Sequence, residues 1–195
     1  TVVDADQVDR DEAFDVGREP KSIAGRFAAD DLGQSCLLAA RLVEHGVRFV
    51  SVTHDGWDTH TENFEGHKKL LPPFDAAITA LEQTLREKGL LDRTLVVATG
   101  EFGRTPSINK HSGRDHWPRT MWTLVTGGGI RPGRLVGGTD KKGHGPDDAT
   151  HLKPDDLAAT IFRALGVDHK LEYHTKTGRP VILVQHGEPI RELFA

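Results

Sequence analysis

Two short β-branched runs separated by one helical segment constrain this chain more than any other feature. Val47–Thr53 alternates apolar and polar residues as strands do, and Thr94–Thr99 is an apolar run typical of a parallel strand buried on both faces. Between them, Pro72 and Pro73 open a predicted helix over Phe74–Lys88, which has apolar residues along one face. Strand, helix and strand in this order predict a crossover between two parallel strands.

The same alternation continues on both sides of this segment. A helix is predicted over Gly33–Glu44, where apolar residues recur at helical spacing before Gly46. The remaining predicted elements are a strand over Thr120–Thr126, a helix over Pro154–Leu165 and a strand over Val181–Val184. We therefore predict an α/β fold with a mainly parallel sheet flanked by helices.

Length, charge and cysteine content narrow the possible functions. A chain of 195 residues suits one domain, predicted over residues 30–195 after a polar, partly irregular segment over residues 1–29. The net charge of -4, with scattered Lys and Arg, argues against a nucleic-acid partner, and no apolar run reaches the roughly 18 residues needed for membrane insertion. Cys36 is the single cysteine and is predicted to be an inert core thiol, so any metal must be held by His, Asp and Glu.

Polar side chains gather directly after the first predicted strand. His54 and Asp55 are the first residues of the loop after that strand, and Asp58 and His60 follow in the same loop, two positions apart. Because open α/β sheets place ligands where strands end, Asp58 and His60 are candidate ligands, with His54 and Asp55 as spare ones. Mixed oxygen and nitrogen donors suit zinc or manganese. In the alternative interpretation, Asp58 caps a turn and His60 is a surface histidine.

A second polar group follows the other predicted strand. Glu101 comes directly after Gly100 and requires a partner, since an unpaired buried carboxylate is costly. Arg104 either pairs with Glu101, or leaves Glu101 to the ion and binds a phosphate or sulfate through its planar guanidinium. In Asp115-His116, one residue can bind the ion while the other orients a ligand.

Four motifs stand out along the chain: Gly56–His60, Gly100–Pro106, Gly113–Trp117 and Gly187–Leu193. Together they resemble an uncharacterised bacterial family, domain of unknown function 1501, which is grouped with the sulfatases and alkaline phosphatases. The resemblance begins at about Phe27, corresponds to the C-terminal half of that family, and implies an alkaline-phosphatase-like fold and an exported or periplasmic location.

The resemblance also implies roles for single residues. Asp58 and His60 resemble an Asp and a nearby His that bind metal in the superfamily, and His116 resembles a later metal-binding His. Glu101 and Phe102 stand where the superfamily has an Asp-His pair, so one imidazole is missing and the second metal position is weakened. The superfamily's first metal-binding Asp and its nucleophile belong to the N-terminal half, outside this chain.

Two functions follow as hypotheses. In the first, a zinc or manganese ion held by Asp58, His60, Glu101 and His116 polarises a small phosphate or sulfate ester, and Arg104 binds the oxyanion. In the second, the protein keeps the fold as a non-catalytic binding or scaffold protein. The clustered ligands favour the enzyme, and Phe102 favours the scaffold.

Overall fold

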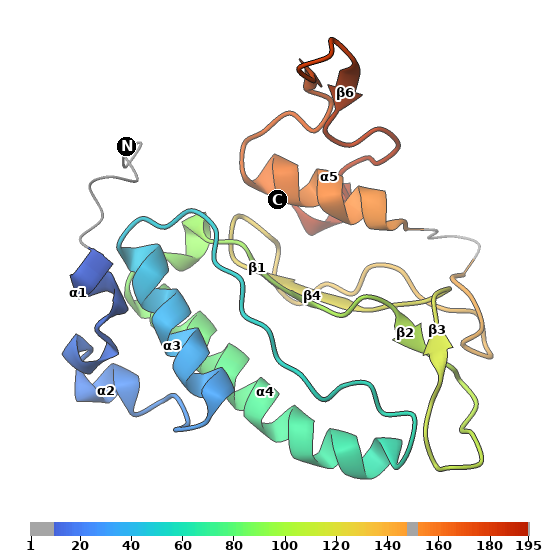
Figure 1. The fold of residues 1–195 in the computed structure, drawn as a ribbon, viewed down its shortest axis with the longest axis horizontal. Helices are drawn as coiled ribbons and strands as arrows, with labels where there is room; N and C mark the ends of the chain where they lie inside the picture. The colour runs from blue at the N-terminus through green and yellow to red at the C-terminus, as the bar shows by residue number, and fades with distance from the viewer. Residues whose placement is uncertain (1–9, 148–151, 195) are drawn as a thin grey trace. The chain divides into compact units, whose positions relative to one another are not determined.

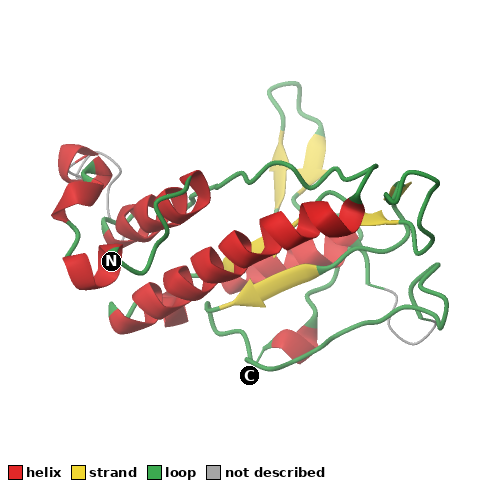
Figure 2. Ribbon diagram, turned by 90° about the horizontal axis from the view of Figure 1, so that it is seen from below, coloured by secondary structure: helices red, strands yellow, loops and turns green. Residues whose placement is uncertain are grey.

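The computed structural model describes residues 10–147 and 152–194 and contains helices and three pairs of short antiparallel strands (Figures 1 and 2). Contacts divide the chain into two units: Thr1–Thr94 with Ser107–Asp115, and Leu95–Pro106 with His116–Ala195. Within the described ranges, no helix combines the length and apolarity needed to cross a bilayer. The predicted mixture of helices and strands is therefore confirmed at the level of an α/β protein.

The first unit is built from helices. Part of the predicted polar segment, residues 1–9, lies outside the described residues, and the remainder contains short helices joined by irregular chain. The helices of this unit are α1 (Arg10–Phe14), η2 (Val16–Arg18), α2 (Lys21–Ala24), α3 (Asp31–Glu44), α4 (Asn63–Glu87) and η3 (Leu91–Arg93).

Helices α3 and α4 pack against each other and form the core of the first unit (Figure 1). The carboxylate of Asp30 accepts a hydrogen bond from Gly33 N at 2.7 Å and caps α3, which ends before Gly46 at φ 87°. The predicted helix is therefore confirmed. Cys36 is buried in this core, and burial together with the charge of Asp30 raises the pKa of its thiol to about 11, as expected for an inert cysteine.

Helix α4 begins at Asn63, eleven residues before the predicted start at Phe74. Pro72 and Pro73 lie inside this helix, although proline removes a helical hydrogen bond. The additional turns are anchored at their beginning, where Asn63 N donates to Ser112 O at 2.9 Å. This tertiary bond satisfies an N–H group that has no partner within the helix, and local sequence signals do not reveal it.

A buried ionic cluster ties the N-terminal segment to both long helices. The side chain of Glu19 is 1% exposed and contacts Arg41 Nη1 at 2.7 Å and Lys88 Nζ at 2.6 Å. Arg41 also donates to Glu12 O at 2.6 Å, and Lys88 also pairs with Glu44 at 2.7 Å. Burial alone would raise the pKa of Glu19, but its contacts with Lys88 and Arg41 outweigh burial and hold the pKa below its ordinary value.

The predicted strand over Val47–Thr53 is wrong: no strand is present between α3 and α4. Residues 50–53 instead run beside α3 as irregular chain. Alternating β-branched residues favour an extended backbone, but a strand also needs a neighbouring ladder partner. The pattern within one segment cannot specify that partner.

In the second unit, β1 (Val96–Thr99) pairs with β4 (Thr123–Thr126), so both predicted strands exist. Their pairing is antiparallel, with Val96 opposite Thr126 and Thr99 opposite Thr123, and β1 is half-buried rather than buried on both faces. The predicted parallel sheet is not found among the described residues, where all strand pairs are antiparallel. An apolar run reports burial, and it carries no information about the direction of its partner.

In the second unit, the C-terminal tail (residues 187–194) is hydrogen-bonded to a helix that precedes it in the sequence. Thr160 in α5 (Pro154–Ala164) accepts a hydrogen bond from Ile190 N at 2.9 Å and donates to Asp156 O at 2.6 Å. A side chain at Gly187 would place its Cβ 2.1 Å from Asp155 O, so the glycine permits close packing. The tail motif thus has a structural role. The last elements are β5 (Glu172–His174) paired with β6 (Pro180–Ile182), and η4 (Arg191–Leu193).

Candidate metal site

Trp57 anchors the loop that carries the first candidate ligands. Its indole ring makes edge contacts with His67 and Phe74 of α4, at centroid distances of 5.5 Å and 5.7 Å. Its Nε1 donates to His54 Nδ1 at 3.3 Å. The loop is therefore packed against α4, and His54, predicted as a spare ligand, serves the packing of Trp57.

Thr59 and a second loop of the same unit hold the next residues in place. Thr59 is buried; its hydroxyl accepts a hydrogen bond from Asn63 Nδ2 at 2.6 Å, and its carbonyl accepts from Arg114 N at 3.1 Å. Gly113 is packed so closely against His60 that a Cβ would lie 1.8 Å from the His60 carbonyl oxygen. The glycine of the Gly113–Trp117 motif is thus required for the two loops to meet.

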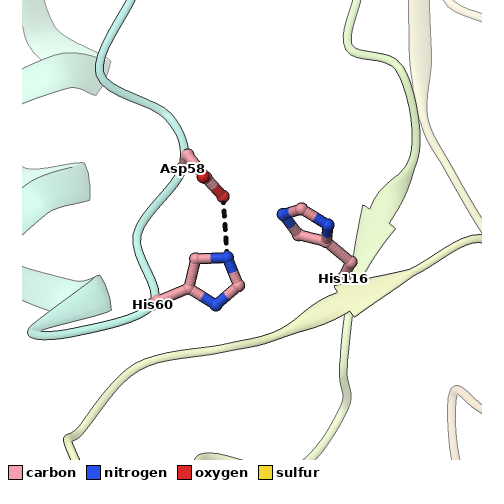
Figure 3. A group of neighbouring side chains, drawn as sticks. All are labelled: Asp58, His60 and His116. Atoms are coloured by element: carbon pink, nitrogen blue, oxygen red, sulfur yellow. Dashed lines mark ion pairs between the residues drawn. The ribbon is translucent and has the colours of Figure 1, made fainter.

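His60 lies between two carboxylates of the first unit. Its Nε2 is 3.1 Å from Asp58 Oδ1, the pair marked in Figure 3, and its Nδ1 is 2.9 Å from Asp115 Oδ1. The His60 side chain is 44% exposed, and both carboxylates are more exposed still. An imidazole held by a carboxylate at one nitrogen presents its other nitrogen in a fixed direction, as metal-binding histidines do.

His116 is joined to this group by the peptide bond that follows Asp115. One ligand atom each of Asp58, His60 and His116 lies within 4.8 Å of the others, so these three side chains are a possible metal-binding group (Figure 3). The structure therefore supports the prediction that these motifs contain a possible metal-binding group. Which ion would bind there stays a prediction. Two histidine nitrogens and a carboxylate oxygen are donors that zinc and manganese accept.

Two other motif residues, Arg104 and Phe102, lie next to His116 in the structure. β3 (His116–Trp117) pairs antiparallel with β2 (Gly103–Arg104), so Arg104 stands directly opposite His116. The ring of Phe102 lies on that of His116, with centroids 4.5 Å apart and planes at 53°. The ring of Phe102 thus packs against the imidazole of His116.

Two predicted residues stay outside this group. Glu101 is exposed after the end of β1 and is not a member of the possible metal-binding group found among the described residues. Asp55 is exposed and is not a member either. Their predicted roles, and that of Arg104 toward an oxyanion, stay predictions. Asn109, which contacts both His60 and Asp115, was not predicted, because an isolated asparagine in a loop carries no distinctive sequence pattern.

Fold and site together define an α/β protein with a candidate metal-binding group formed by a loop, which carries Asp58 and His60, and the short strand β3, which carries His116. Residues 3–194 match the family described as protein of unknown function (DUF1501), and the chain belongs to this family. No curated protein and no solved structure matches the chain significantly.

Proposed function

We propose that this protein is a metal-dependent hydrolase of phosphate or sulfate esters whose ion is held by Asp58, His60 and His116. The observation that carries the proposal is the placement of His60, with Nδ1 on Asp115 and Nε2 toward Asp58. Metal-binding histidines are commonly oriented in this way by a carboxylate on the second nitrogen. The donor set fits zinc or manganese, and Glu101 is proposed as a further ligand.

In this proposal, Asp115, Phe102 and Arg104 have different roles around the ion. Asp115 holds the imidazole of His60, and Phe102 supports that of His116. Arg104, opposite His116 in the strand pair, is proposed to bind the oxyanion of the ester through its planar guanidinium. A bound divalent ion would polarise the ester and stabilise the charge that develops on the transferred group.

The wider assignment rests on the resemblance to sulfatases and alkaline phosphatases. We propose that the site belongs to a fold of that kind and that the nucleophile comes from the family's N-terminal half. The substrate would be a small anionic ester, and an exported or periplasmic location is part of the same proposal.

A non-catalytic binding or scaffold protein is the second candidate. Phe102 favours it, because an aromatic ring cannot bind a second ion where the superfamily has an imidazole. A single-ion site with a phenylalanine is compatible with structural metal binding as well as with hydrolysis. Activity therefore has to be measured together with metal content.

The experiment uses the protein with the family's N-terminal half included, where the proposed nucleophile belongs, and compares the wild type with His60→Ala, Arg104→Ala and, as a control, His174→Ala in the exposed strand β5. We expect His60→Ala to lose most bound zinc or manganese and the hydrolysis of aryl phosphate or sulfate esters together. Arg104→Ala should keep the metal and lower kcat/KM by about 10- to 150-fold, which corresponds to a charge-assisted bond of roughly 1.5–3 kcal/mol.

His174→Ala should change neither quantity. A wild-type protein that binds no divalent ion would contradict the metal site. Metal binding that depends on His60, without turnover of either ester class, would favour the scaffold.

A further inference from the structure

Every polar atom of the Asn109 side chain is engaged, and all of its partners lie in the first unit. Nδ2 donates to His60 O at 3.0 Å and to Asp115 Oδ1 at 3.1 Å. Oδ1 accepts from His111 N at 2.9 Å and from Gly113 N at 3.0 Å. Two donors and two acceptors are the full capacity of an asparagine amide, so this side chain is saturated.

The bond to Asp115 reaches the same oxygen that contacts His60. Asp115 Oδ1 lies 2.9 Å from His60 Nδ1 while it accepts from Asn109. Asn109 therefore touches His60 twice, directly at its carbonyl and through Asp115 at its imidazole. Both contacts lie away from Nε2, the nitrogen that faces Asp58.

The backbone N–H and carbonyl groups of Asn109 are hydrogen-bonded as well. Asn109 N donates to Gly113 O at 2.9 Å, and Ser112 N donates to Asn109 O at 3.1 Å. Gly113 has no side chain, and its place against the His60 carbonyl would admit none. The loop over residues 109–113 is thus held by its own hydrogen bonds in a conformation that directs the amide of Asn109 toward His60 and Asp115.

We propose that Asn109 is a positioning residue that fixes the carboxylate of Asp115 and thereby the orientation of the His60 imidazole. This inference deepens the proposed function and rests on it for the role of His60 as a ligand. An exposed aspartate has several rotamers available, and a bond to Asn109 selects the one that receives His60 Nδ1. The amide is specifically required, because an aspartate at this position could not donate to Asp115 or to the His60 carbonyl.

The substitution Asn109→Asp separates the donor role of the side-chain NH₂ group from the acceptor role of the side-chain oxygen. The variant keeps acceptors for His111 N and Gly113 N, loses both donors and places a carboxylate against Asp115. Gln83→Glu is the matched control, since it makes the same amide-to-carboxylate change beside Glu87 on the exposed face of α4.

The first readout is the His60 Nδ1–H proton resonance of the metal-free protein. In the wild type and in Gln83→Glu we expect a downfield signal from a slowly exchanging proton. In Asn109→Asp the signal should be lost, because the proton should exchange rapidly with water. The second readout is zinc affinity, which should fall by about 10- to 100-fold in Asn109→Asp, as for other residues that orient a ligand. An unchanged Nδ1–H signal in folded Asn109→Asp would overturn the proposal.

The metal-free readout keeps this inference separate from the proposed function. A wild type that binds no zinc contradicts the metal site, while the Nδ1–H signal still decides the role of Asn109. If Asn109→Asp does not fold, the wild-type protein provides the test through the side-chain NH₂ protons of Asn109. Both protons should be protected from exchange and shifted downfield, and exchange at the rate of a solvated asparagine would overturn the proposal.

Discussion

Glu19→Gln should destabilise the first unit strongly, because it removes the negative charge at the centre of a buried ionic cluster. The substitution preserves the shape of the side chain but leaves Arg41 and Lys88 without their shared buried counterion. Breaking a buried pair in this way costs about 3–5 kcal/mol. Because Lys88 retains its pair with the more exposed Glu44, we expect about 3 kcal/mol, the lower end of that range.

The effect should depend on pH in a definite direction. The pKa of Glu19 in the folded protein lies below its ordinary value of 4.5, so folding favours the charged form. Its contribution to stability is fully present above pH 4.5 and is lost as the pH falls through the lower pKa of the folded state. The difference between wild type and variant should therefore be constant near neutral pH and shrink in acid.

Urea-induced unfolding of the wild type, Glu19→Gln and Glu65→Gln tests this reasoning. Glu65 pairs with Lys68 on the exposed face of α4, and its substitution should leave the free energy of unfolding unchanged. If Glu19→Gln unfolds at the same urea concentration as the wild type, or if its deficit is the same at acid and neutral pH, the account of the cluster is refuted.

Two further substitutions probe the loops and the tail. Gly113→Ala should destabilise the protein by about 1–3 kcal/mol and weaken zinc binding, because the new Cβ would lie 1.8 Å from the His60 carbonyl oxygen; an unaltered melting temperature and zinc affinity would contradict the loop contact. Thr160→Val should cost about 1–3 kcal/mol, because Ile190 N loses its buried acceptor, and hydrogen exchange at Ile190 should accelerate; unchanged exchange would argue against the docking of the tail on α5.

Sequence patterns predicted the elements whose signals are local. The helix α3 has Asp30 at its beginning and Gly46 after its end, and the strand β4 ends at three glycines with positive φ. Such caps and turn residues act within a few residues of the element that they end. Both elements were therefore predicted with their observed last residues, Glu44 and Thr126, while their predicted starts differ by two and three residues.

Elements that depend on distant partners were predicted less well. The start of α4 depends on Ser112, and the antiparallel direction of β1 depends on β4. Val47–Thr53 has the composition of a strand but no ladder in the structure. Pattern within a segment reports conformational preference and burial, and it does not report which other segment supplies the hydrogen bonds.

For the candidate site too, some residues were predicted from the sequence and one was missed. Asp58, His60 and His116 were predicted from their chemistry and from the motifs around them, and the structure brings these three together. Asp115 was predicted either to orient a ligand or to serve as a spare one, and in the structure its carboxylate contacts His60 Nδ1 at 2.9 Å. Asn109 was missed because its contact with His60, 49 positions away in the sequence, is made by the fold. Its local bonds to His111 N and Gly113 N carry no distinctive sequence pattern.

The central claim is that one divalent ion binds between Asp58, His60 and His116. Its most direct test is an anomalous difference map at the zinc absorption edge from crystals of the zinc-loaded protein. We predict one strong peak about 2.0–2.2 Å from His60 Nε2 and from a carboxylate oxygen of Asp58, with His116 as a further ligand. A map without a peak at His60, or with zinc bound only to other side chains, would contradict the claim.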